Sequence, residues 1–255
     1  MVEAAGATLQ GGLVKRSADA FVDPETSTLY LAELAGVAPG DRILDAGCGV
    51  GGPALAIAGA LPDVVIDGVT VSEVQAKMAR ERIAAANLDD RVRVHLADFH
   101  RLPFSDESFD VALYLEVTGY SPDRTALYRE SARILRPGGT VYVKDLFRQE
   151  EPLTVGQRRS MAIFDKLWCC VRSPTLSETA HAMQAAGLVD VQTRQYPFVD
   201  MEHYYESMVS RDDGGIRLNA FGRAFFHVAP DLPVLFGEAK ARKRGPATPV
   251  KRTAR

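Results

Sequence analysis

Cysteine is scarce in this chain, which has three cysteines among 255 residues. Cys48 stands alone, and Cys169 and Cys170 are neighbours that cannot easily bridge each other. This spacing indicates neither a disulfide framework nor a zinc site. We therefore interpret the three as ordinary thiols of a reducing compartment and expect no metal held by the protein alone.

Long hydrophobic runs and a strong net charge are also missing. No apolar stretch approaches the roughly 20 residues that span a bilayer. Residues 1–10 lack the basic and then apolar pattern of a signal peptide. The net charge of -3 argues against a nucleic-acid partner. We expect a soluble, cytoplasmic protein without a membrane span, and a homodimer stays open as its assembly.

The apolar sequence that is present suffices for a full core. Hydrophobic residues make up 46% of the chain and charged residues 25%, over a length typical of one α/β domain with a modest insertion. We predict a single domain over residues 1–237, with a cofactor core at about 38–147 and a substrate or lid region at about 148–237. Residues 238–255 are basic and contain proline, which predicts a disordered tail.

A glycine-rich loop follows a short apolar segment. Residues 42–52 read R-I-L-D-A-G-C-G-V-G-G, which predicts a buried strand, a loop and the start of a helix. Glycines let the backbone approach a ligand closely, and the helix directs its free N–H groups at that ligand. The segment indicates a nucleotide-cofactor site, although Gly47, Gly49 and Gly52 also have the G-x-G-x-x-G spacing of a dinucleotide fold.

Two residues argue against a dinucleotide. The next predicted strand ends at Thr70, where a NAD-binding fold usually places an acid for the ribose. Asp45 precedes the first glycine, and a carboxylate facing the loop would repel a pyrophosphate and attract a cation. S-adenosylmethionine carries an ammonium and a positive sulfur and has no pyrophosphate, so it suits this loop better.

Further segments extend the pattern in the expected order. They are D-A-G-C-G-V-G-G at 45–52, V-R-V-H-L-A-D-F at 92–99, L-P-F at 102–104, S-F-D-V-A at 108–112 and L-R-P-G-G at 135–139. Together they resemble class I S-adenosylmethionine-dependent methyltransferases over roughly residues 38–146. The resemblance implies S-adenosylmethionine as cofactor, with Asp98 accepting from the adenine amino group and Phe99 packing on the ring.

The fold class we expect is α/β, with a doubly wound, mostly parallel, seven-stranded Rossmann-like sheet and a helical lid insertion. Strands at 42–46, 64–70, 91–96, 109–115 and 139–146 are too apolar for a sheet exposed on one face. Ligands bind at the carboxyl ends of such strands, so Gly47, Thr70, Asp98 and Glu116 should line one crevice. The predicted cofactor-binding residues are Asp45, Gly47, Cys48, Gly49, Gly51, Thr70, Ser72, Gln75, Asp98, Phe99 and Glu116.

Two motifs point to the acceptor. Residues 114–122, Y-L-E-V-T-G-Y-S-P, are similar to the Y-x-I-E-A-T-x-H-A-P segment of sterol C-methyltransferases, with Tyr120 in place of the histidine. Residues 68–75, G-V-T-V-S-E-V-Q, resemble a segment of tocopherol, cyclopropane-lipid and geranyl diphosphate methyltransferases. These families methylate carbon. The resemblance therefore favours C-methylation of an isoprenoid alkene in secondary metabolism, with prenyl diphosphates ahead of sterol-like or quinone-like acceptors.

Glu116 has a chemical role in such a reaction. Methylation of an isolated C=C leaves a carbocation, which a carboxylate stabilises and deprotonates. Aromatic faces also hold cations. We predict Glu116 and Tyr120 as catalytic residues, and Mg²⁺ would accompany a diphosphate acceptor. The predicted substrate-binding residues are Tyr114, Tyr120, Phe164, Trp168, Arg148 and Tyr196, with Lys144, Arg159 and Arg172 as further cations for a diphosphate.

Downstream of residue 147 the sequence carries no recognised motif. A helix over 155–171 places Phe164 and Trp168 on one face, which is either a core face or a lid over the crevice. Residues 201–236 are predicted to be mostly helical.

Two other functions remain open. An O- or N-methyltransferase of a natural-product intermediate would use Glu116, His100 or His181 as the base. A non-catalytic S-adenosylmethionine-binding protein would bind the cofactor without turnover.

Overall fold

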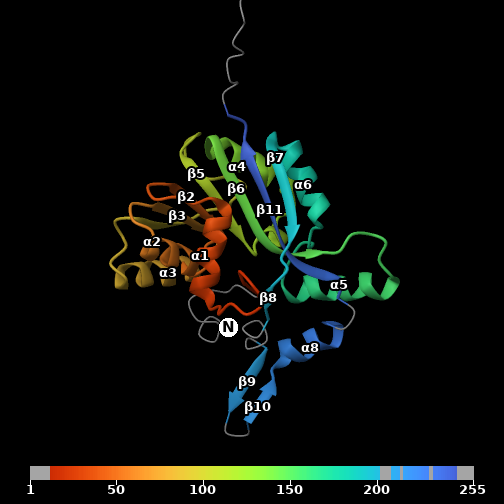
Figure 1. Cartoon of the computed structure of the whole chain (residues 1–255). Helices are drawn as coiled ribbons and strands as arrows, with labels where there is room; N and C mark the ends of the chain where they lie inside the picture. The colour runs from red at the N-terminus through yellow and green to blue at the C-terminus, as the bar shows by residue number, and fades with distance from the viewer. Residues whose placement is uncertain (1–11, 202–207, 213–214, 230–231, 246–255) are drawn as a thin grey trace, which may run out of the picture.

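A seven-stranded sheet forms the centre of the molecule (Figure 1). The computed structural model describes residues 12–201, 208–212, 215–229 and 232–245. The strands lie in the order β4-β3-β2-β5-β6-β11-β7. Their bounds are β2 Arg42–Ala46, β3 Val65–Thr70, β4 Val92–Leu96, β5 Phe109–Leu115, β6 Leu135–Arg148, β7 Leu188–Gln195 and β11 Val234–Lys243.

The sheet is mostly parallel, as the sequence predicts. Strands β4, β3, β2, β5 and β6 pair in parallel, whereas β11 runs antiparallel to both β6 and β7. The chain moves outward from β2 to β4 and then returns to β5 on the other side of β2. The strand order therefore reverses between β2 and β5, which is where an open α/β sheet forms its ligand crevice.

Helices cover both faces, and all of them except α2 begin at a residue whose side chain caps the helix. Ser72 caps α3 by accepting from the Gln75 N–H, and Asp123 caps α4 by accepting from Ala126. The helix α1 was not predicted from the sequence, although Asp23 caps its start and Gly36 ends it in the left-handed conformation. The helices on the sheet are α1 Pro24–Ala35, α2 Gly52–Ala60, α3 Glu73–Ala85, α4 Arg124–Ile134 and α6 Leu176–Ala185.

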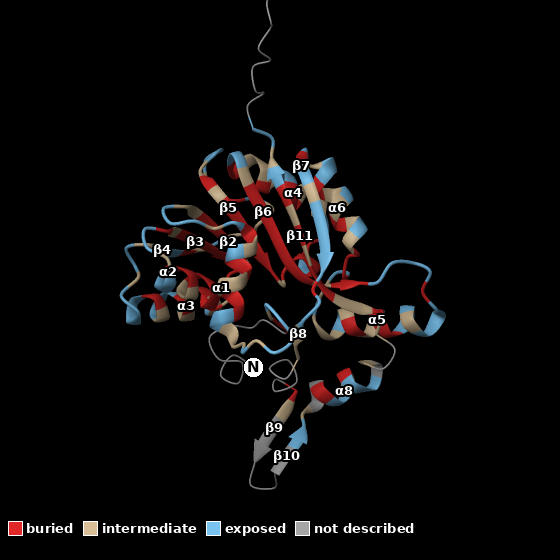
Figure 2. Cartoon of the chain, viewed as in Figure 1, coloured by how far each residue is buried: buried red, intermediate tan, exposed pale blue. Residues whose placement is uncertain are grey.

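The core consists of two apolar layers, one on each face of the sheet. Adjacent strand residues point to opposite layers: Ile43 packs with α1, α2 and α3, whereas Leu44 packs with α4 and α6. Figure 2 shows buried residues running along the central strand β6. This arrangement confirms the doubly wound α/β fold.

A smaller cluster lies beyond the carboxyl ends of the strands. Met161 and Phe164 of α5 pack there with Met208 and with Phe225 of α8. The prediction of a mostly helical segment at 201–236 is wrong for the described residues, because a hairpin and the start of β11 share this region with α8. The elements of this region are α5 Val155–Leu167, β8 Val199–Asp200, β9 Val209–Asp212, β10 Gly215–Leu218 and α8 Ala220–Val228, with β1 Leu13–Val14 paired to β8.

The prediction of a disordered tail from residue 238 is wrong as far as residue 243. Strand β11 is hydrogen-bonded on both edges, so backbone pairing holds it without large apolar side chains. From residue 238 on, its buried side chains are the small Ala239 and Ala241, and Lys240, Arg242 and Lys243 beside them give this segment the basic composition of a solvated tail. Lys240 donates to the Leu34 carbonyl at 2.8 Å. Residues 246–255 lie outside the described residues.

Within the described part of the chain, no helix combines the length and the hydrophobicity of a membrane-spanning segment.

Strand β11 offers a direct test of this correction. We expect Ala241→Asp to lower the free energy of unfolding by about 3–5 kcal/mol, because it places an unpaired charge at a buried position. The adjacent Arg242→Asp, at an exposed position, should change it by less than about 0.5 kcal/mol. Urea unfolding followed by circular dichroism measures both, and equal effects would show that β11 is not part of the sheet.

Candidate functional site

A cavity of about 560 Å³ opens at the carboxyl ends of the parallel strands. One part of its wall is the glycine loop after β2, followed by the ends of β3, β5 and β6. The other part comes from α5 and the segment behind it. Predicted residues that line the cavity are Gly47, Cys48, Gly49, Thr70, Gln75, Asp98, Phe99, Glu116, Tyr120, Phe164 and Trp168.

The glycine loop has no room for side chains at its first turn. Gly47 has a φ of 75°, and a Cβ there would lie 2.5 Å from Val117 Cγ1. The N–H groups of Gly47 and Cys48 donate to the Val69 carbonyl, which fixes the loop against β3. Gly51 is the N-cap of α2 and lies outside the cavity wall, whereas Gly52 and Pro53 of the first helical turn line it. The start of α2 therefore faces the cavity with its positive dipole end.

A polar pair follows at the end of β3. Thr70 Oγ1 donates to Gln75 Oε1 at 2.9 Å, which leaves the Gln75 amide group as a donor toward the cavity. Ser72 lies outside the cavity wall and instead holds Gln75 in place as the cap of α3. The pair suits a neutral hydroxylated group such as a ribose.

Asp98 and His100 form a second polar group in the cavity wall. Asp98 Oδ1 accepts from the His100 backbone N–H at 2.8 Å and lies 2.7 Å from His100 Nδ1. Burial would raise the pKa of Asp98, but these hydrogen bonds outweigh it and the pKa is lowered. His100 Nε2 is 2.9 Å from Ser121 Oγ, so the ring is oriented at both nitrogens.

Asp45 does not face the cavity, in contrast to the sequence expectation. It is buried behind the loop, outside the cavity wall, where it accepts from the N–H of Ala54 in α2. Its Oδ2 has no hydrogen-bond partner among the described residues. Burial raises the pKa of this carboxyl to about 7. Asp45 therefore supports the loop from below and does not present a charge to a ligand. Burial likewise raises the pKa of the neighbouring Cys48 thiol.

Glu116 lies where the sequence places it, directly after β5. Its φ of 58° is in the left-handed region, which is uncommon for residues other than glycine and costs about 1–2 kcal/mol. Its backbone N–H donates to the Lys144 carbonyl at 2.7 Å, and its carboxylate forms an ion pair with the Lys144 ammonium. The side chain is 20% exposed and lines the cavity.

Aromatic side chains cover the same space. Phe164 and Trp168 stack with ring centroids 4.8 Å apart, and both line the cavity together with Tyr120. Burial, followed by nearby acidic groups, raises the pKa of Tyr120 to about 12, so its hydroxyl serves as a donor at neutral pH. The helix α5 therefore contributes to the wall of the cavity, and Phe164 also packs in the cluster with Met161 and Phe225. That α5 acts as a lid stays a prediction.

Asp145 was missed by the sequence analysis. It follows Lys144 near the end of β6 and lines the cavity. Its Oδ2 accepts from the N–H and the hydroxyl of Thr118 at 2.9 and 2.6 Å. Burial raises its pKa to about 6. The rule that ligands meet the carboxyl ends of parallel strands, applied to β6 as to the other strands, would have found it.

Two predicted substrate residues are core residues instead. Tyr114 is fully buried between the sheet and α4, with its hydroxyl 2.7 Å from Ser131 Oγ. Its side chain packs in the apolar layer that α4 and α6 form with the sheet. Tyr196 is buried with its hydroxyl 2.7 Å from that of Tyr142. Neither lines the cavity.

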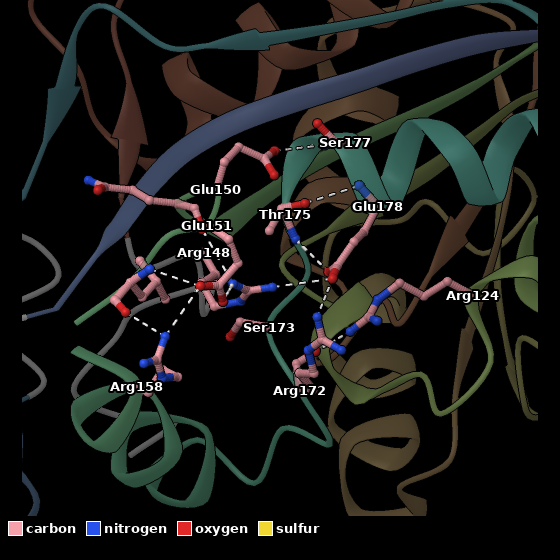
Figure 3. Close-up of polar contacts among 12 residues, drawn as sticks. Arg124, Arg148, Glu150, Glu151, Arg158, Arg172, Ser173, Thr175, Ser177 and Glu178 are labelled. Carbon is pink, nitrogen blue, oxygen red and sulfur yellow. Dashed lines mark hydrogen bonds and ion pairs between the residues drawn. The ribbon is translucent and has the colours of Figure 1, made fainter. Parts of the chain in front are cut away.

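Arg148 also lies outside the cavity wall. Figure 3 shows it turned toward acidic residues at the base of α5, where it pairs with Glu151 at 3.1 Å and with Glu178 at 3.2 Å. Glu178 also pairs with Arg172, so one carboxylate joins the segments before and after α5. These arginines fix the helix that forms the cavity wall. His181, on α6, is exposed and also lies outside the wall.

Comparison with known proteins gives a consistent result. Residues 44–143 match a family model described as a methyltransferase domain. Over these residues the chain has the sequence pattern of a methyltransferase domain. Over 131 residues it is 43% identical to 27-O-demethylrifamycin SV methyltransferase of Amycolatopsis mediterranei, covering 50% of this chain and 48% of that protein. Over 128 residues it is 41% identical to 24-methylenesterol C-methyltransferase 2 of Oryza sativa subsp. japonica, covering 48% and 35%.

Solved structures share the methyltransferase fold over most of the chain. Geranyl diphosphate C-methyltransferase from Streptomyces coelicolor A3(2) has a TM-score of 0.71 at 21% identity, covering 95% of this chain and 94% of that chain. The cyclase SpnF has a TM-score of 0.73 at 23% identity, covering 94% and 89%. At these identities the likeness shows the fold alone. The chain spans less than half the length of the two curated relatives.

The cavity of the methyltransferase domain fits S-adenosylmethionine. The closely packed turn at Gly47 leaves the loop backbone facing the cavity, and polar groups at Gln75 and Asp98 suit a ribose and an adenine. In the described ranges, no group of three or more histidine, cysteine or acidic residues has the arrangement of a metal site.

Two glycines with similar backbone conformation but different surroundings distinguish the effect of steric fit from that of backbone conformation. Gly40 and Gly47 both have positive φ, but a Cβ on Gly40 would meet nothing within 4 Å. Replacement by alanine in the left-handed region costs about 1–2 kcal/mol at either site. We expect Gly47→Ala also to weaken S-adenosylhomocysteine binding by about tenfold or more, and Gly40→Ala to leave it unchanged, in calorimetric titrations. Equal affinities of the two variants for S-adenosylhomocysteine would show that the Gly47 loop does not contact the cofactor.

Asp45 gives a pH-dependent prediction. A carboxyl whose pKa is raised in the folded state favours folding below its ordinary value of 3.8, and this contribution is lost as pH rises through about 7. From pH 5 to pH 8 we expect the wild type to lose about 2–3 kcal/mol of unfolding free energy relative to Asp45→Asn. Urea titrations at each pH measure the difference, and parallel stability curves would contradict the buried, unpaired position.

Proposed function

We propose that this protein transfers the methyl group of S-adenosylmethionine to a carbon of a neutral isoprenoid alkene, with Glu116 as the base. The observation that carries the proposal is that a carboxylate at the end of β5 and a wall of aromatic rings line the same cavity as the glycine loop. The motif likeness to sterol C-methyltransferases around Glu116, and the rice sterol enzyme among the relatives, support it.

The charge of the cavity favours a neutral acceptor over a prenyl diphosphate. Three carboxyl groups line it, on Asp98, Glu116 and Asp145. An anionic diphosphate would be repelled by those that are ionised. Lys144, Arg148 and Arg172, which were predicted to hold a diphosphate, are paired with glutamates of the protein. The proposal therefore places neutral isoprenoids ahead of the diphosphates that the sequence favoured.

The residues of the cavity divide the work of the reaction. When bound, S-adenosylmethionine supplies an electrophilic methyl group, and the alkene π electrons form the new C–C bond as the S–CH₃ bond breaks. The positive charge then lies on the neighbouring acceptor carbon. Phe164 and Trp168 offer ring faces to it, and they displace water that would otherwise trap it. Glu116 takes a proton from the adjacent carbon, and the C–H electron pair becomes the new C=C bond.

A hydroxyl acceptor is the second candidate. His100 lies in the cavity with Asp98 on one ring nitrogen and Ser121 on the other, an arrangement that orients an imidazole as a general base. A rifamycin O-methyltransferase is among the relatives. In this reaction His100 removes the hydroxyl proton as the oxygen attacks the methyl group.

One acceptor screen separates the candidates. Purified protein is incubated with methyl-labelled S-adenosylmethionine and three classes of acceptor: neutral isoprenoid alkenes, prenyl diphosphates with Mg²⁺, and hydroxylated polyketides. We expect a C-methylated alkene, and we expect Glu116→Gln to lower kcat by about 10²–10⁴-fold while S-adenosylhomocysteine affinity stays within about threefold.

The matched variant in this screen is His100→Gln, which should retain C-methylation. An O-methylated product lost in His100→Gln and retained in Glu116→Gln would replace the first candidate with the second. Cofactor binding without product from any acceptor class would support a non-catalytic S-adenosylmethionine-binding protein instead.

A further inference from the structure

Lys144 carries a charge at a fully buried position, where charged side chains are rare. Its side chain is 0% exposed, near the carboxyl end of β6, a strand paired on both edges. A buried ammonium is tolerated only when partners replace its lost hydration. The contacts of Lys144 are the Glu116 carboxylate, the Gly12 carbonyl at 2.7 Å and the ring of Phe236, with its centroid 5.1 Å from Nζ.

Gly12 joins this group from a distant part of the chain. Its N–H donates to Glu116 Oε1 at 3.5 Å, so Glu116 and Lys144 both contact the same glycine. A Cβ on Gly12 would lie 2.8 Å from Phe236 Cζ and 2.8 Å from Val199 Cγ1. The glycine is therefore enclosed, and its backbone reaches the ion pair because it lacks a side chain.

The residues after Gly12 hold it in position. Strand β1 pairs with β8, and Lys15 donates its N–H to the Phe198 carbonyl at 3.0 Å. The N–H of Val14 donates to Ser27 Oγ of α1 at 2.9 Å. Through Gly12, this amino-terminal segment, residues 12–15, thus contacts the carboxylate of Glu116, the base of the proposed reaction.

We propose that Lys144 is a positioning residue that joins the amino-terminal segment to Glu116, so that the base is in its working position only when Gly12 is docked. The methyl-transfer part of this inference rests on the proposed function. The ion pair restrains the Glu116 carboxylate against a backbone that is itself in the left-handed region. The docking of residues 12–15 and the orientation of the Glu116 carboxylate are therefore coupled.

Trypsin tests the docking without any acceptor. Cleavage after Lys15 or Arg16 requires residues 12–15 to leave β8, and mass spectrometry follows it in the full chain. We expect Lys144→Met and Gly12→Ala each to accelerate this cleavage by about fivefold or more. The control for the first is Lys240→Met, which removes a lysine that donates to the Leu34 carbonyl from β11, and the control for the second is Gly59→Ala, with nothing within 4 Å of the new Cβ. Both controls should be cleaved at the wild-type rate.

Kinetics test the positioning. With the acceptor found in the screen, Lys144→Met should lower kcat by about tenfold and leave KM for S-adenosylmethionine unchanged. In the Glu116→Gln background the same substitution should have no further effect, because a residue that acts through Glu116 has nothing left to position. Equal thermal stability of Lys144→Met and Lys240→Met would show that the loss is not one of folding.

The outcomes are separable. Cleavage at the wild-type rate in Lys144→Met overturns the proposal, whether or not an acceptor is found. Faster cleavage with unchanged kcat, or a further loss of kcat in the Glu116→Gln background, overturns the positioning role. If the wild type methylates no acceptor, the proposed function fails, and the cleavage experiment alone decides whether Lys144 holds the amino-terminal segment.

Discussion

Parallel pairing of β2 with its neighbours is the constraint on which the site depends. Because β2 lies between β3 and β5, the chain segments that leave all three strands emerge at one edge of the sheet. That edge receives the glycine loop, Thr70 and Glu116 from positions far apart in the sequence. The core on both faces fixes these strand ends, and polar pairs such as Thr70–Gln75 and Glu116–Lys144 orient the side chains at the cavity.

The acidic groups at this edge of the sheet differ in pKa because they differ in burial and in hydrogen bonding. Asp45 and Asp145 are both buried beside the cavity, and burial raises the pKa of each. Asp98 is more exposed than these two. One of its oxygens accepts from the His100 backbone N–H and lies beside His100 Nδ1, and these contacts lower its pKa. The pKa values of these three aspartates are therefore shifted in different directions because their surroundings differ.

The sequence predicts the parts of the structure that depend on local patterns. The parallel strands, the capped helices and the loop at Gly47 follow from apolar runs, caps and glycines, and the structure confirms them. It does not predict β11, whose stability comes from pairing with β6 and β7 and not from its own composition. Tyr114 and Tyr196 were assigned to the site from residue type alone, and the structure buries both in the core, where each hydroxyl lies against a buried hydroxyl partner. The contact of Gly12 with Lys144 spans 132 residues, and no local pattern signals it.

We expect the cofactor to extend from Asp98 and Phe99 across the glycine loop toward Glu116. A crystal structure with S-adenosylhomocysteine tests it most directly. We expect the adenine beside Phe99, the ribose at Gln75 and the sulfur on the side of the cavity that Glu116 and the aromatic wall share. A sulfur that faces away from Glu116, or an adenine bound outside the wall formed by Asp98 and Phe99, would contradict this placement of the cofactor and the role of Glu116 as the base.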